Sequence, residues 1–250
     1  MDNTVGIRTY RVDEIVLKII VIEFILILVK YELMLRLLEK NAFFNKKEEE
    51  WVGRIVSSIH AIVVTTMFVV FYFKYPQFSV EHDLFYSPFN CTVFICFSLA
   101  YFLVDLLMIV TKNFEKNKLH IPHHVVAILS ILLGLLNDEY YLGMMMLLCM
   151  EGSTPFINNI FFLKELNLKN SVLYVINGIL LLVTWIFFRF VAGIGYFFYL
   201  MYVNWERYKQ KPFLGCYWIF MQLVFMTLNI YWFSKILRGF MKMFTKNKKL

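Results

Sequence analysis

The chain contains seven stretches in which apolar side chains run long enough to cross a lipid bilayer as a helix. A transmembrane helix needs about 20 mostly apolar residues. The sixth stretch is longer than one perpendicular crossing requires, so we expect it to tilt or to bend near Gly193 and Gly195. The pattern predicts an all-α, multi-pass membrane protein with about seven transmembrane helices. The predicted spans are residues 15–36, 52–74, 90–111, 120–136, 140–163, 171–203 and 215–240.

The composition supports this interpretation. Of the 250 residues, 60% are apolar and 17% are charged, whereas charged residues make up about 25% of an ordinary soluble domain. The mean hydropathy is +0.64, and a core of this size cannot bury so many apolar side chains, so lipid must cover most of them. A disordered chain is excluded and a soluble enzyme is disfavoured. The formal net charge of +7 fits loops that face anionic lipid, and no nucleic-acid partner is predicted.

Lysine and arginine are distributed unevenly between the two sets of segments that connect the predicted spans. The richer set includes the C-terminal tail, and the poorer set includes the N-terminus. By the positive-inside rule, the N-terminus is predicted to be lumenal or external and the C-terminus cytoplasmic. The last residues, Lys246-Asn247-Lys248-Lys249-Leu250, resemble a cytosolic dilysine retrieval signal. This tail favours the endoplasmic reticulum, with another organelle membrane as the alternative.

Ionisable side chains at membrane depth are the first candidates for a functional site. They are costly there unless they are paired, neutralised or turned toward a cavity. With a rise of about 1.5 Å per residue, the four that precede residue 130 are predicted to share the leaflet at the cytoplasmic end. Glu151 is predicted near the middle of the bilayer, where it could meet Arg189. The candidates are His60, Asp105, His123, His124, Glu151 and Arg189.

Pro122 is predicted to lie in the first turn of the helix that carries His123 and His124. Because adjacent helix positions point about 100° apart, only one histidine can face a shared cavity squarely, and the other can anchor a partner such as Asp105. A purely structural alternative is that the pair satisfies Asp105 and a backbone carbonyl, holding two helices together. No metal site is predicted. The chain has five histidines, which are too few for a histidine-rich di-iron site, and it has no HExxH motif.

Polar residues interrupt the fifth predicted span at residues 151–158. Pro155 removes a backbone donor, so we expect a bend there, with Ser153 or Thr154 satisfying the broken turn. Such a bend either shapes a pocket for a lipid headgroup or serves only the packing of the helices. Asn229, in the last span, is expected to form a hydrogen bond between helices.

Six local motifs follow one another along the chain. They are Arg54-Ile55-Val56-Ser57-Ser58-Ile59-His60, Tyr101-Phe102-Leu103-Val104-Asp105, His123-His124, Glu151-Gly152-Ser153-Thr154-Pro155-Phe156-Ile157-Asn158, Arg189 and Leu228-Asn229-Ile230-Tyr231-Trp232-Phe233. In this order they resemble the TLC-domain family, which is named for its translocation-associated, ceramide-synthase and neuronal-lipofuscinosis members. The resemblance divides the chain into an N-terminal segment with one transmembrane helix (1–44), a TLC domain (45–243) and a basic cytoplasmic tail (244–250).

The resemblance implies six helices forming a membrane barrel around a cavity for long-chain lipid, plus one N-terminal helix. In the ceramide synthases of this family, the paired histidines matched here by His123 and His124 pass an acyl group from acyl-coenzyme A to a sphingoid amine. The synthases carry further aspartates on the following helix, where this chain has Glu151-Gly152-Ser153-Thr154-Pro155. The sequence is therefore closer to the non-synthase branch, whose members are linked to membrane lipid composition.

Three functions follow as hypotheses. The first is a protein of membrane lipid homeostasis that binds acyl-chain lipids in the barrel. The second is an acyl-CoA-dependent N-acyltransferase with catalytic His123, His124 and Asp105, with acyl-CoA as substrate and no other cofactor. The third is a non-catalytic accessory subunit of a larger membrane complex, with protein partners docked on the charged first helix and the basic tail. The predicted lipid-binding residues are His60, Asp105, His123, His124, Glu151, Ser153, Thr154, Asn158, Arg189 and Asn229.

Overall fold

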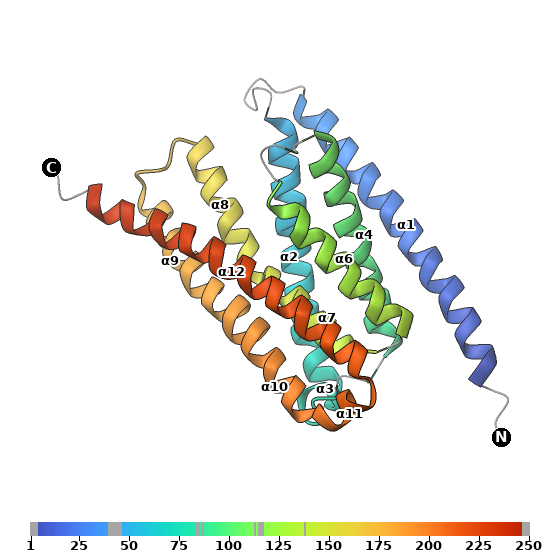
Figure 1. The fold of residues 1–250 in the computed structure, drawn as a ribbon. Coiled ribbons are helices and arrows are strands. Elements are labelled where there is room, and N and C mark those ends of the chain that lie inside the picture. Colours follow the sequence, from blue (N-terminus) through green and yellow to red (C-terminus); the bar gives the residue numbers. More distant parts are fainter. Residues whose placement is uncertain are drawn as a thin grey trace. The chain divides into compact units, whose positions relative to one another are not determined.

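The computed structural model describes residues 5–39, 47–83, 86, 88–112, 114, 118–137 and 139–246, with side chains from residue 15 to residue 242. Every regular element in these residues is helical (Figure 1). A backbone in lipid must satisfy its hydrogen bonds within its own segment, which a helix does. The chain is thus an all-α, multi-pass membrane protein. The dilysine-like residues 247–250 lie outside the described residues.

The chain divides into two compact units. The first unit consists of residues 1–56 and 85–144, and the second of residues 57–84 and 145–250. Helices α2 and α7 each begin in the first unit and end in the second. Their bounds are Glu48–Lys74 for α2 and Tyr141–Cys149 for α7.

The first unit is built on α4 (Phe89–Lys112), which packs against α1 (Val5–Glu39) and against α6 (His120–Asn137) (Figure 1). Helix α1 begins before the predicted TLC domain, yet it contributes to the core of this unit. Its Tyr31 side chain is 3% exposed and packs with Leu35 and with Val52 of α2.

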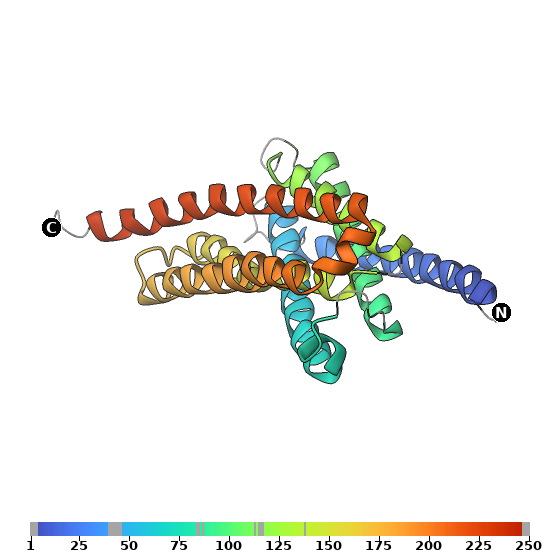
Figure 2. The same cartoon turned by 60° about the horizontal axis from the view of Figure 1, so that its bottom comes forward.

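The second unit contains the rest of α2 and the helices from α8 to α12. The segment from Val172 to Val203 is one continuous helical stretch, made of α9, a π-helix η3 and α10. Helix α12 packs along α9 and η3 (Figure 2). The bounds are α3 (Pro76–Ser79), η2 (Met150–Ser153), α8 (Thr154–Glu165), α9 (Val172–Trp185), η3 (Ile186–Gly195), α10 (Tyr196–Val203), α11 (Trp205–Gln210) and α12 (Pro212–Lys246).

Five of the predicted spans are confirmed as described helices that are long and apolar enough to cross a membrane. Helix α1 is continuous, but its charged residues keep it out of this group. The predicted span 140–163 is divided by a 3-10 turn, η2, into α7 and α8, so the count of seven is not confirmed. The break precedes Pro155, in the first turn of α8, which confirms the predicted interruption. The five are Glu48–Lys74, Phe89–Lys112, His120–Asn137, Val172–Val203 and Pro212–Lys242.

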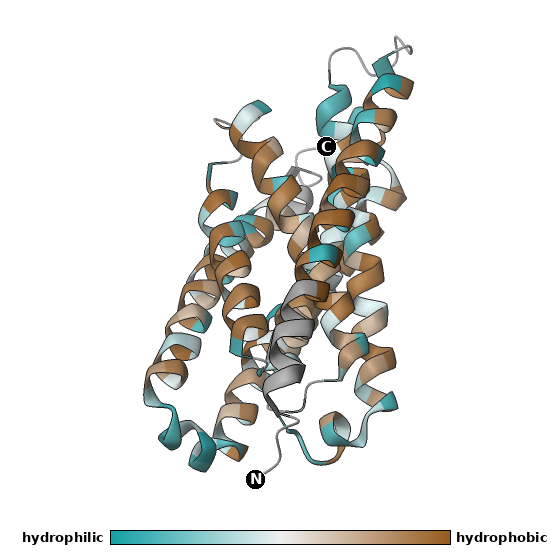
Figure 3. Cartoon of the chain, turned by 90° about the vertical axis from the view of Figure 1, so that its right-hand side faces the viewer, coloured by the Kyte–Doolittle hydropathy of each residue, from teal (hydrophilic) through white to brown (hydrophobic). Residues whose placement is uncertain are grey.

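Apolar residues run along the helices, and hydrophilic residues gather near their ends (Figure 3). Many large apolar side chains point outward: Val172 of α9 is 73% exposed and Val183 is 59% exposed. Lipid is the environment that covers such a surface at little cost. The predicted six-helix barrel, which would draw on both units, stays a prediction.

Candidate functional site

The first unit contains a buried polar pair formed by Asp105 of α4 and His124 of α6. Nε2 of His124 lies 2.7 Å from Oδ2 of Asp105. The histidine side chain is 7% exposed and the aspartate side chain is 23% exposed. On the other side of the ring, Nδ1 of His124 lies 2.9 Å from the backbone oxygen of His120, one turn earlier in α6. Both ring nitrogens of His124 therefore have a partner.

The two contacts require one proton on Nδ1 of His124 and a second proton between His124 and Asp105. A carbonyl oxygen only accepts, so Nδ1 of His124 carries a proton. A second proton must lie between Nε2 and the Asp105 carboxyl group, because two lone pairs at 2.7 Å would repel. The pair is then either an imidazolium with a carboxylate or a neutral imidazole with a carboxylic acid. Both forms carry no net charge, which lowers the cost of placing the pair inside a bilayer.

His123 lies beside this pair, with its ring plane turned by 78° from that of His124. Its ring makes edge contacts with Phe102, at 6.4 Å between centroids, and with His124, at 5.5 Å. Helix α6 begins at His120, so Pro122 lies in its first turn, as predicted. His124 is the histidine that anchors Asp105, as expected for one member of the pair. The expectation that the other histidine faces a shared cavity stays a prediction.

The second unit contains a buried cluster around Arg189 of the π-helix η3. The arginine is 5% exposed. Its Nε donates to Oγ of Ser153 at 2.8 Å, and its Nη1 donates to Oδ1 of Asn229 at 3.0 Å. Its guanidinium carbon also lies 4.2 Å from the centroid of the Trp185 ring. The planar guanidinium is therefore held from several sides at once.

Glu151 supplies the negative charge of this cluster, through Thr154. The hydroxyl of Thr154 donates to Oε2 of Glu151 at 2.6 Å and accepts from Nη2 of Arg189 at 3.4 Å. The direct distance from Nη2 of Arg189 to Oε1 of Glu151 is 3.9 Å. The meeting of Glu151 and Arg189 predicted from the sequence is thus observed, with a hydroxyl group bridging the charges.

Two glycines allow η2 and η3 to approach closely enough for this cluster to form. A Cβ atom on Gly193 would overlap the Met150 side chain, and a Cβ atom on Gly152 would lie 2.7 Å from the Phe188 ring. The π-helix η3 ends at Gly195, in the region where the sequence predicted a tilt or a bend, and the bend itself stays a prediction. π-helical segments are rare and recur at functional sites.

The remaining predicted site residues belong to the second unit. His60 of α2 is 3% exposed. Nδ2 of Asn158 donates to Oγ of Ser58 at 3.0 Å, which ties α8 to α2. Asn229, predicted to bond between helices, does so through Arg189. A single site that contains all ten predicted residues stays a prediction.

Several contacts of polar and aromatic side chains were not anticipated from the sequence. Trp185 and Ser58 bear no pattern that distinguishes them from other residues of apolar helices. Asn177 of α9, whose Nδ2 donates to the Phe156 carbonyl at 2.9 Å, is also new. A polar residue inside an apolar run was the one available signal for Asn177.

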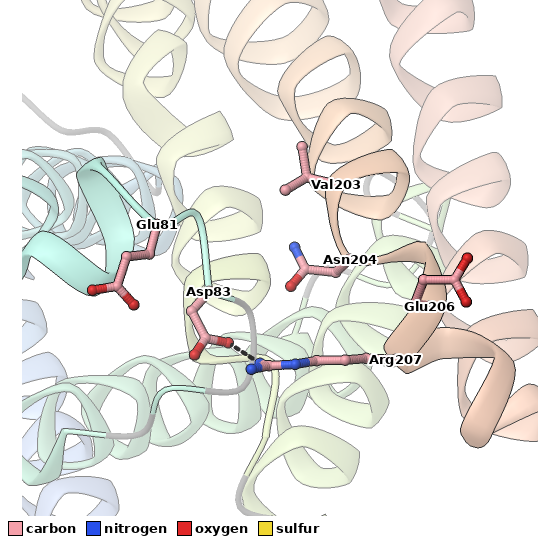
Figure 4. A pocket seen from close by; sticks show the side chains of 6 residues that line it. All are labelled: Glu81, Asp83, Val203, Asn204, Glu206 and Arg207. Atoms are coloured by element: carbon pink, nitrogen blue, oxygen red, sulfur yellow. Dashed lines mark hydrogen bonds and ion pairs between the residues drawn. The ribbon is translucent and has the colours of Figure 1, made fainter.

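The second unit also has a surface pocket of about 300 Å³ between the segment after α3 and the α10–α11 corner (Figure 4). Arg207 crosses it to Asp83, with Nη1 2.6 Å from Oδ1. Nearby, Nδ2 of Asn204 donates to the His82 carbonyl at 2.9 Å. These bonds join the two segments that form the pocket. In the part of the chain that is described, no three His, Cys, Asp or Glu side chains are grouped to hold a metal ion.

Comparison with known proteins is consistent with the motifs and the fold. A family model described as the TLC domain matches residues 50–238, more than half of the chain. The chain is 29% identical over 207 residues to human TLC domain-containing protein 4, covering 81% of this chain and 78% of that protein. It is 30% identical over 215 residues to TLC domain-containing protein 4 A of Dictyostelium discoideum, covering 84% and 81%. It is 27% identical over 192 residues to mouse TLC domain-containing protein 1, covering 76% and 74%.

The predicted family is thereby confirmed, and these relatives are members of its non-synthase branch. The family match starts at residue 50. It therefore includes the Asp105–His124 pair and the Arg189 cluster and leaves α1 outside. The chain belongs to the TLC domain family.

Proposed function

We propose that this membrane protein binds an acyl-chain lipid, with the lipid headgroup at the Asp105, His123 and His124 side chains of the first unit. The observation that carries the proposal is the 2.7 Å bond between His124 and Asp105 inside two apolar helices. One hydrogen-bonding side chain is enough to hold two membrane helices together, whereas this site places a carboxyl group and two imidazole rings side by side. The partial exposure of the Asp105 side chain, 23%, leaves part of its carboxyl group for a ligand.

The chemistry of the three side chains suits a lipid headgroup. Headgroups and the linkages to their acyl chains carry hydroxyl, amide, ester or phosphate groups, which need donors and acceptors at a defined depth. Asp105 offers an acceptor, and His123 offers a ring that can donate or accept. The apolar residues of α4 and α6 would contact the acyl chain, since ligand sites combine apolar walls with few polar groups.

Native mass spectrometry of the full chain in a mild detergent tests the proposal. The wild type is expected to retain a lipid with the mass of a phospholipid or sphingolipid, and His123→Gln to release most of it. His120→Gln is the matched control, because His120 is exposed at the start of the same helix and contributes its backbone oxygen to the site. Equal retention by both variants, or no retained lipid in the wild type, would overturn the proposal.

A second candidate is acyl transfer, which the arrangement of the two histidines favours. His124 is engaged at both nitrogens, so it would orient the site while His123 attacks. A nitrogen of His123 would bond to the thioester carbonyl of an acyl-CoA, and the carbon–sulfur bond would break to release the thiol. An amine would then displace the imidazole, forming an amide. Incubation with acyl-CoA in the absence of an amine should add one acyl mass at His123, and an unmodified protein would exclude this route.

We also propose that the protein resides in the endoplasmic reticulum with a cytoplasmic C-terminus. The dilysine-like tail and the uneven distribution of Lys and Arg support this location. Replacing Lys246 and Lys248 by alanine should shift the protein to later compartments. An unchanged distribution of that variant would contradict the retrieval role of the tail.

A further inference from the structure

Helix α12 changes its chemical character at Lys235. From residue 212 to residue 234 the sequence has no Asp, Glu, Lys or Arg. At about 1.5 Å per residue this part is roughly 35 Å long, close to the hydrocarbon thickness of a bilayer, which is about 30 Å. The helix nevertheless continues to Lys246. A bilayer aligned with the uncharged part, residues 212–234, would leave the last three turns of the helix outside the hydrocarbon core.

The extension presents three basic side chains on one face. Lys235, Arg238 and Lys242 are three and four positions apart, so they line up along the helix, and all three are exposed. We call them the basic stripe. The sequence contains no acidic residue from position 212 to the end of the chain. The positive charge of the stripe is therefore not neutralised by its own helix.

The stripe is held at the level where the helix leaves the apolar layer. Nζ of Lys235 lies 4.4 Å from the centroid of the Tyr231 ring, one turn closer to the apolar part. Nε of Arg238 donates to the Ser234 carbonyl at 3.1 Å. Both side chains thus fold back along the helix. Tyrosine is enriched at the boundary between hydrocarbon and headgroups, where its ring and its hydroxyl are both accommodated.

Gly239 leaves a gap in the surface between the two lysines. Apart from its two chain neighbours and the backbone of its own helix, no described atom lies within 4 Å of the position that a Cβ atom on Gly239 would occupy. Lys235 precedes this glycine by four residues and Lys242 follows it by three, so the open position lies between these two positions along the stripe.

The apolar side of the extension is also exposed. Leu237 is 41% exposed and Met241 is 57% exposed. A helix with a basic face and an apolar face is typical of segments that lie at the boundary between acyl chains and headgroups. Further basic residues, Lys164 and Lys169, are exposed around the α8–α9 connection, which lies at the same end of this unit as the end of α12 (Figures 1 and 2).

We infer that the basic stripe binds the headgroups of anionic phospholipids in the leaflet where α12 ends. The stripe lies where headgroup phosphates are, directly after an apolar span, and clusters of Lys and Arg at such positions attract acidic lipids. The basic stripe shares no residue with the Asp105–His124 pair, and the inference does not depend on the proposed function.

Lipid titration of the full chain, followed by native mass spectrometry, tests the inference, with phosphatidylserine and phosphatidylcholine as probes. The variant is Lys235→Gln with Lys242→Gln. The control is Lys209→Gln with Lys211→Gln, which removes the same charge from two exposed lysines in and after α11. The wild type should bind phosphatidylserine more tightly than phosphatidylcholine. The stripe variant should lose about tenfold in affinity for phosphatidylserine, and the control less than about twofold.

Salt provides a second measurement that needs no variant. Phosphatidylserine binding to the wild type should weaken as ionic strength rises, because exposed charges are screened, while phosphatidylcholine binding should not. Equal affinity of the wild type for the two lipids would overturn the inference. So would an equal loss in the stripe variant and the control.

Discussion

Asp105 and His124 are joined by a 2.7 Å hydrogen bond between α4 and α6, and the second ring nitrogen of His124 faces the backbone oxygen of His120. The imidazole is therefore fixed in its orientation. Because one proton is shared with a carboxyl group, the pair is electrically neutral as a unit. This arrangement allows two ionisable side chains to exist between apolar helices.

Removing either member of the pair should destabilise the protein. Loss of one partner of a buried ion pair costs about 3 to 5 kcal/mol, and the partial exposure of Asp105 reduces the expected cost of His124→Ala to about 2 kcal/mol. Thermal unfolding of Asp105→Ala, His124→Ala and the double variant measures the coupling, which should reach at least about 1 kcal/mol. Strict additivity of the two single effects would mean that the bond contributes nothing.

The Arg189 cluster makes a prediction about charge. Arg189→Met should strongly lower the unfolding temperature, because it leaves the Glu151 carboxylate buried without its cation. Adding Glu151→Gln to that variant should recover part of the loss. The unfolding temperatures of Arg189→Met, Glu151→Gln and the double variant measure this recovery. If the double variant unfolds at the same temperature as Arg189→Met, the buried Glu151 carboxylate is not the cause of the destabilisation.

Two glycines in the second unit should respond oppositely to a methyl group. Gly193→Ala should cost about 1 to 3 kcal/mol, because its Cβ atom would overlap Met150. Gly239→Ala is the matched control in an open helical position, and it should be neutral or stabilising by up to about 1 kcal/mol. Unfolding of both variants in detergent provides the comparison. Similar effects at the two sites would contradict the close approach of η2 and η3.

Helix α1 should be necessary for the stability of the first unit, although the family match begins after it. Tyr31→Ala should cost about 3 to 5 kcal/mol, the range for deleting a fully buried aromatic side chain. Leu33→Ala, at a position of the same helix that is 56% exposed, should stay within about 0.5 kcal/mol. If Tyr31→Ala unfolds at the same temperature as the control, α1 is only loosely attached.

Much of the architecture could be predicted from the sequence because lipid imposes a simple rule of length and apolarity on spanning helices. Five spans and the break before Pro155 follow from that rule and from the missing proline donor. The rule fails where charge and length conflict. Helix α1 has charged residues such as Glu23 and Lys30, and α7 and α8 are separated by η2.

The candidate site could be predicted only in part. Ionisable residues in apolar runs predicted that one of the two histidines would pair with Asp105 and that Glu151 could meet Arg189, because such residues need partners in lipid. The structure identifies the histidine as His124. The π-helix η3 could not be predicted, since an apolar run of this length has the sequence pattern of an ordinary α-helix. The contact of Trp185 with Arg189 could not be predicted either, because the sequence around Trp185 looks like that around any buried aromatic residue.

Photo-crosslinking with a lipid that carries a diazirine next to its headgroup tests the central claim most directly. Peptide mapping of the crosslinked wild type should locate adducts on α4 and α6 near Asp105 and His123. His123→Gln should reduce these adducts, and His120→Gln should not. Adducts confined to outward-facing residues such as Val172 and Val183, and unchanged by His123→Gln, would contradict the claim that this site holds a lipid headgroup.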